Sequence, residues 1–174
     1  MIKRFMVGCL AICGLFFVGC AKLDSTPEAK NSRCESPFAF VSMPQISFTD
    51  NDLKITEEEV QEFLKKEIDQ DKCLAVSQVP DASNFKIIVQ SHLDTNKKEG
   101  VVSTAQESIA TIKTSFILSK DRTSSQFNSE QSLKINGKKV LGIGKGAQIS
   151  QKDRQMLLQR AVKKSYEQML GALR

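Results

Sequence analysis

Five cysteines and a single histidine are the residues of this 174-residue chain whose side chains most readily serve as nucleophiles, bases or metal ligands. A catalytic nucleophile needs a base within hydrogen-bonding reach, most often an imidazole. The only imidazole belongs to His92, which we expect on the polar side of a strand, and no G-x-S-x-G motif is present. The lone histidine and the absence of C-x-x-C or H-x-x-x-H spacing also argue against a metal site.

Two further groups of residues resemble catalytic or ligand-binding patterns, and both have simpler explanations. The three consecutive carboxylates at 57–59 fit the acidic first turn of a helix as well as they fit a glycosidase pair. The glycine-rich stretch 142–146 precedes a helix, as phosphate-binding loops do, but Lys145 is followed by Gly146 instead of Ser or Thr. We therefore predict a protein that is not an enzyme, with no cofactor, no metal and no nucleotide.

The first 19 residues have the composition of an export signal. Lys3 and Arg4 precede an apolar stretch of 14 residues, from Phe5 to Val18. That length suits a secretory signal and falls short of the roughly 20 residues that a membrane-spanning helix needs. Removing residues 1–19 removes two basic and no acidic residues, so the net charge falls from +5 to +3. This balance does not predict nucleic-acid binding.

The stretch ends in Phe17-Val18-Gly19-Cys20, and here the chain resembles the lipobox of bacterial lipoproteins. The resemblance implies cleavage before Cys20, a diacylglyceryl thioether on its sulfur, and an acyl group such as palmitate on its new amine. Ala21 stands where Asp would retain such a protein at the inner membrane, so the family rule favours the outer membrane, facing the periplasm. An ordinary signal peptide with a chance cysteine and an uncleaved anchor helix are the alternatives.

The remaining cysteines predict a disulfide. Cys9 and Cys13 leave with the signal, and Cys20 would carry lipid, so Cys34 and Cys73 are left as an even pair in an oxidising compartment. Closing a loop of about 40 residues would contribute roughly 4 kcal/mol in the chain-entropy model. Two free thiols or a metal site are the alternatives.

Behind the signal, residues 20–37 read as a lipidated, polar tether and residues 38–174 as a single domain. We expect an extended segment over 38–48, in which Pro44 indicates an edge strand or a break, and then a helix from a capping box at Thr56 and Glu59 to about Asp71. Next come a turn at 80–84, a strand over 85–93, a turn at 96–100 and a strand over about 107–119. A polar loop at 120–125, a hairpin turned at Asn136-Gly137 and a helix capped at Ser150 complete the chain.

This order predicts an α+β fold: a two-layer sandwich whose mostly antiparallel sheet of four to five strands carries two amphipathic helices on one face. The lipidated start and the order of elements resemble the LptE-like lipopolysaccharide-assembly lipoproteins. The resemblance implies two helices on a four-stranded sheet and a role as the plug of a barrel-shaped translocon. No residue motif carries this likeness, so no functional residue is transferred.

Basic residues are concentrated at the end of the sequence. From Lys134 onward ten basic residues stand against two acidic ones, an excess of +8. Such a group could contact lipid phosphates or a glycolipid headgroup, or it could be a solvated helix face. The candidate contacts are Lys138, Lys139, Lys145, Lys152 and Arg154.

We expect an envelope lipoprotein that is held to the membrane by its lipid and binds a protein or glycolipid partner. A lipid-anchored hydrolase, or an activator of a cell-wall enzyme, is the alternative.

Overall fold

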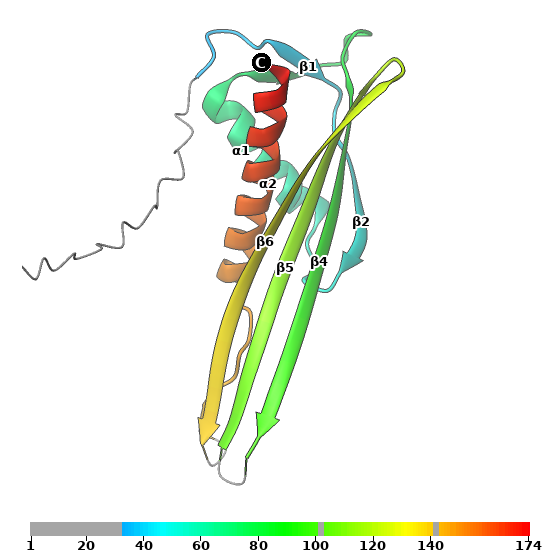
Figure 1. The fold of residues 1–174 in the computed structure, drawn as a ribbon. Helices are drawn as coiled ribbons and strands as arrows, with labels where there is room; N and C mark the ends of the chain where they lie inside the picture. Colours follow the sequence, from blue (N-terminus) through cyan, green and yellow to red (C-terminus); the bar gives the residue numbers. More distant parts are fainter. Residues whose placement is uncertain (1–32, 101–102, 141–142) are drawn as a thin grey trace, which may run out of the picture. The chain divides into compact units, whose positions relative to one another are not determined.

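The computed structural model describes residues 33–100, 103–140 and 143–174, in which two helices lie on one side of a long sheet (Figure 1). The predicted α+β sandwich is confirmed. The predicted signal segment and the predicted lipidation site, Cys20, lie outside the described residues. Within the described ranges, no helix is both long and apolar enough to cross a membrane.

Five strands form the main sheet, in the order β2-β4-β5-β6-β7. Strand β2 (Gln45–Asn51) is parallel to β4, and the other neighbours are antiparallel. The long strands are β4 (Asn84–Glu99), β5 (Ser103–Lys120) and β6 (Thr123–Val140), and the short β7 (Ile143–Lys145) follows at one edge. A separate small parallel sheet joins β1 (Ala39–Val41) to β3 (Leu74–Val76).

Both helices begin where the sequence predicts. Helix α1 (Glu57–Asp71) starts with the expected capping box of Thr56 and Glu59, and α2 (Gln151–Leu173) starts with an equivalent box at Ser150 and Asp153. The apolar stripe of α2 is buried over most of its length, although Leu173 remains partly exposed. In α1 the buried face also contains Glu67, a charged residue that an amphipathic helix would be expected to expose. Burial raises the pKa of the Glu67 carboxyl group.

The core occupies only the part of the sheet that the helices cover. There, alternate residues of β4 and β5 point toward the helices, and Phe85 meets Phe116 edge to face with ring centroids 5.4 Å apart. A buried polar contact also joins the layers, because the Thr114 hydroxyl donates to the Ala161 carbonyl of α2 at 3.0 Å. Beyond Ser91, every remaining residue of β4 is exposed.

Two predicted connections are wrong because the strands continue through them, and a third is shorter than predicted. Residues 96–99 belong to β4, and Asn136-Gly137 lies inside β6 instead of at a hairpin tip. The polar loop at 120–125 shortens to a tight turn at Asp121 and Arg122 between paired β5 and β6. In these distal stretches most side chains are exposed on both faces of the sheet, so the apolar alternation that marks a strand is missing.

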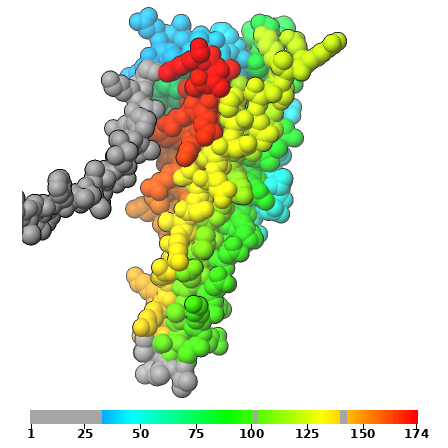
Figure 2. Space-filling model, in the orientation of Figure 1, coloured from blue at the N-terminus to red at the C-terminus, as the bar shows by residue number. Residues whose placement is uncertain are grey.

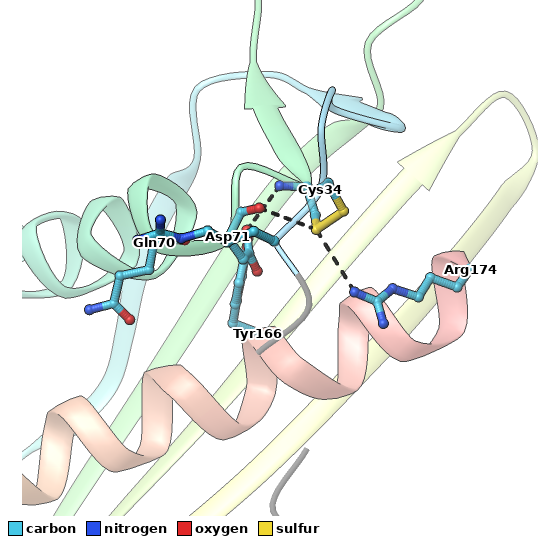
Figure 3. The surroundings of a disulfide bond; sticks show 7 residues. Cys34, Gln70, Asp71, Tyr166 and Arg174 are labelled. Atoms are coloured by element: carbon cyan, nitrogen blue, oxygen red, sulfur yellow. Dashed lines mark hydrogen bonds between the residues drawn. A yellow bond between two sulfur atoms is a disulfide. The ribbon is translucent and has the colours of Figure 1, made fainter. Parts of the chain in front are cut away.

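The disulfide predicted between Cys34 and Cys73 is confirmed, and it attaches the start of the domain to the end of α1 (Figure 3). The Cys34 amide donates to the Asp71 carbonyl at 2.8 Å, and the Asp71 carboxylate accepts from the Tyr166 hydroxyl at 2.8 Å. Burial, with the Asp71 carboxylate beside it, raises the pKa of Tyr166. The disulfide, α1 and α2 therefore meet at one end of the domain.

A substitution at Gly137 tests the observed position of this residue inside β6. A Cβ atom at this position would overlap the backbone of Gly146 and Ala147, which crosses β6 there. We expect Gly137→Ala to lower the free energy of unfolding by about 1–3 kcal/mol, because that backbone must shift. Gly171→Ala is the matched control, since a Cβ there meets nothing within 4 Å. Urea titrations that show equal effects for the two variants would contradict the close approach at Gly137.

Candidate functional site

The far end of the long strands brings together lysines that are distant in the sequence. Strand register places Lys98 opposite Ala105, Ala105 opposite Lys138, and Lys138 opposite Lys145. Directly opposed residues of antiparallel strands project from the same face, so these three lysines form a row across the sheet. One residue along, Lys97 and Lys139 project from the other face, to which Phe85 and Phe116 also belong.

We call this group the lysine end: Lys97, Lys98, Lys138, Lys139 and Lys145. All five residues are exposed, and Figure 2 shows the ends of β4 and β6 standing clear of α2. Glu99 is the one acidic residue among the described residues of this part of the sheet. The paired positions that make up this part are Lys97 to Glu99, Thr104 to Gln106, Gly137 to Lys139, and Gly144 to Lys145. The group therefore carries a local charge of +4.

Lys113 and Lys134 of the same sheet have carboxylate partners, whereas the residues of the lysine end have none in the part of the chain that the structure describes. Lys134 lies 2.5 Å from Glu107, and Lys113 lies 3.2 Å from Glu130. Within the described ranges, no carboxylate lies within ion-pair distance of any of the five lysines. Neighbouring strands are about 4.8 Å apart, closer than the Debye length of about 8 Å at physiological salt. Like charges opposed at this spacing are destabilising, as Lys138 and Lys145 are here.

A hollow of about 200 Å³ opens between these side chains. Lys97, Lys139 and Lys145 line it together with the Thr104 and Gln106 side chains, and its floor includes Gly137 and Gly146. Ammonium, hydroxyl and amide groups are the donors that bind phosphate and carboxylate oxygens. Glu99 also lines the hollow, so an anion would approach from the side of the lysines.

The other two candidate contacts lie on α2 and do not line this hollow. Lys152 is exposed in the first turn of the helix. The Arg154 guanidinium forms a two-pronged ion pair with the Glu59 carboxylate and donates to the Leu53 and Lys54 carbonyls at 3.2 and 2.8 Å. These contacts join the starts of α1 and α2 through Arg154, whose side chain is 17% exposed.

His92 lies on the sheet face that the helices leave uncovered, between two carboxylates. Its Nδ1 is 2.8 Å from Asp52 and its Nε2 is 3.1 Å from Asp94, and these carboxylates, Asp94 most strongly, raise the pKa of the imidazole. Asp52 also accepts from the Leu93 amide at 3.1 Å, so the cluster fastens the end of β2 to β4. Among the described residues, no group of three His, Cys, Asp or Glu side chains is arranged to hold a metal.

Lys97 and Lys98 are the site residues that sequence reasoning missed. They fall in the stretch predicted as a turn, where every side chain of β4 is exposed and no apolar period marks the strand. Only the pairing of β4 with β5, and of β5 with β6, places them beside the C-terminal lysines.

No protein-family model and no curated protein matches the chain. Among solved structures it is similar to a Helicobacter pylori protein described as a neuraminyllactose-binding hemagglutinin homolog, at 11% identity and TM-score 0.47, over 84% of this chain and 90% of that one. It is also similar to rare lipoprotein B from Shewanella oneidensis, at 11% identity and TM-score 0.41, over 74% and 94%. A minor lipoprotein from Acinetobacter baumannii gives 12% identity and TM-score 0.38, over 79% and 92%. No residue role is transferred from these proteins.

The His92 cluster predicts a pH-dependent contribution to stability. Because the pKa of His92 is raised in the folded state from its usual 6.5, the protonated imidazole stabilises the fold at pH 6, and this contribution is lost as the pH rises through the folded-state value. We expect His92→Gln to lower the urea midpoint at pH 6 and to have little effect at pH 9. An equal loss at both pH values would show that the ionic contacts do not stabilise the fold.

Proposed function

We propose that this protein is a non-enzymatic lipoprotein of the cell envelope, anchored through Cys20, whose lysine end binds an anionic protein or glycolipid partner. The signal segment with its lipobox supports the anchor and the envelope location. The lysine end supports the binding role, because three strands and β7 bring five lysines together without carboxylate counterparts among the described residues.

The electrostatic cost of the lysine end favours a ligand. Opposed lysines on adjacent strands repel each other, and an exposed carboxylate at any of these positions would relieve the repulsion. Elsewhere in the same sheet, Lys134 has such a carboxylate partner in Glu107. An anionic ligand would neutralise the ammonium groups on binding, so the affinity should fall as salt is added.

The hollow also narrows the chemistry of the partner. Its volume of about 200 Å³ holds a small charged group and no large apolar body. Clustered ammonium groups with a hydroxyl and an amide beside them suit a phosphate of a glycolipid headgroup or a carboxylate-rich protein segment. Lipopolysaccharide, which the architectural resemblance suggests, carries such phosphates and is the first ligand to test.

The anchor is tested by labelling cells with radioactive fatty acid. We expect the wild-type protein and a Cys13→Ser variant to be labelled, because the cysteine at position 13 lies in the segment to be removed. We expect Cys20→Ser to lose the label, because the acceptor sulfur is gone. Label that persists in Cys20→Ser would disprove lipidation at this residue.

The binding site is tested by titrating fluorescent lipopolysaccharide with a Lys138→Gln, Lys139→Gln and Lys145→Gln triple variant. We expect the affinity to fall about tenfold or more, since each exposed ion pair contributes up to about 1 kcal/mol. The control triple, Lys66→Gln, Lys86→Gln and Lys164→Gln, removes the same charge from exposed positions elsewhere on the fold. Equal losses in the two triples would show that net charge, and not the lysine end, determines binding.

A protein partner is distinguished from a glycolipid by crosslinking in intact cells. A photoreactive residue at Ile143, which is 82% exposed at the lysine end, would capture a specific envelope protein if the ligand is proteinaceous. The same residue at Gln126, on the other half of the sheet, is the control.

A further inference from the structure

The opposite end of the domain carries most of its exposed large apolar side chains. Five of these side chains lie between residues 38 and 79, on β1, β3 and their connections, and they reach 50% exposure at Phe40 and 66% at Met43. We call this group the apolar end: Phe38, Phe40, Met43, Val76 and Val79. In Figure 1, β1 and the C-terminus lie at the end of the sheet opposite the lysine-bearing strand ends.

Two hollows lie beside the small β1–β3 sheet, and the first of them is mainly apolar. A groove of about 380 Å³ runs between this sheet and α1, where Met43 and Val76 face Leu64 and Ile68. A second hollow of about 270 Å³ includes Phe38, Phe40 and Leu173. One lysine and one aspartate line each hollow and pair with each other, Lys65 with Asp69 at 2.6 Å in the first and Lys120 with Asp81 at 2.8 Å in the second.

The attachment of the tether indicates what covers this surface. The disulfide fixes Cys34 to Cys73, the residue directly before β3, and the Phe38 amide donates to the Cys73 carbonyl at 3.0 Å. The chain therefore enters the domain at the apolar end. Thirteen residues lie between Cys20 and Cys34, and at full extension this segment reaches no more than about 50 Å. A lipid on Cys20 would thus keep the apolar end within that distance of the bilayer.

We propose that the apolar end docks on the lipid surface of the membrane, with Phe40, Met43 and Val76 inserted among phospholipid acyl chains. This inference rests on the anchor in the proposed function, but it concerns a separate surface. Burial of exposed apolar side chains at the boundary between headgroups and acyl chains is what drives interfacial membrane binding. The 18-residue strand β5 begins at Ser103 beside the lysine end and finishes at Lys120 near the apolar end. At about 3.3 Å per residue it separates the two ends by up to roughly 60 Å, so docking of the apolar end would hold the lysine end away from the bilayer.

The chain contains no tryptophan, so a single introduced one reports its own surroundings. We expect the emission of a Phe40→Trp variant to shift to the blue when the full-length lipidated protein is placed in phosphatidylcholine–phosphatidylglycerol vesicles. Brominated acyl chains should quench it several-fold more strongly than they quench Ile143→Trp, an exposed apolar position at the lysine end. Equal and weak quenching of the two variants would overturn the docking proposal.

Flotation separates failure of the anchor from failure of docking. Cys20→Ser protein that floats with vesicles as efficiently as the lipidated protein would refute the anchor and leave docking supported. Without lipid, a Phe40→Ser and Met43→Ser double variant on the Cys20→Ser background should bind vesicles about tenfold more weakly than its Ile143→Ser counterpart. Equal binding would overturn docking. Light scattering provides a further test. If the Cys20→Ser protein is a dimer, and the Phe40→Ser and Met43→Ser substitutions dissociate it, docking would also be overturned. The apolar end would then be an interface between two copies of the chain.

Discussion

The continuous backbone pairing of β4, β5 and β6 is the constraint on which the rest of this structure depends. Pairing runs from Asn84 and Ser119 to Glu99 and Thr104 in one ladder, and from Lys120 and Thr123 to Ser103 and Val140 in the other. Only the half of these ladders under the helices has a core. The distal half has few buried side chains, so its strands are held by hydrogen bonds that propagate outward from the packed half.

The register of these ladders decides the chemistry of the lysine end. Because side chains alternate, a slip of one residue in β6 would move Lys138 to the other face and separate it from Lys98. Burial of Phe116 and its neighbours in the packed half opposes that slip. The close crossing over Gly137 adds a second restraint near the lysines themselves. The core thus positions a site with which it shares no side chain.

The same division explains what could be predicted from the sequence. Helix α2, the buried half of β4 and the disulfide were predicted correctly, because each has a buried face, a capping box or a cysteine pair that leaves a local pattern. The strand ends were not predicted, since exposure on both faces removes the period and Asn136-Gly137 then resembles a turn. Arg154 was assigned to a partner surface because its contact with Glu59, 95 residues away, leaves no trace in the local sequence.

If the lysine end binds a partner as proposed, the two ends of the ladder would also determine how effectively the two meet. A tether of at most about 50 Å would let an undocked domain tumble, and its lysines would sweep a large volume on both sides of the attachment point. Docking of the apolar end would remove most of that freedom and hold the lysines at one height above the lipid. A binding group confined to a layer has a higher effective concentration toward a partner held in the same layer. Docking and anion binding would then reinforce each other without any change in the conformation of the domain.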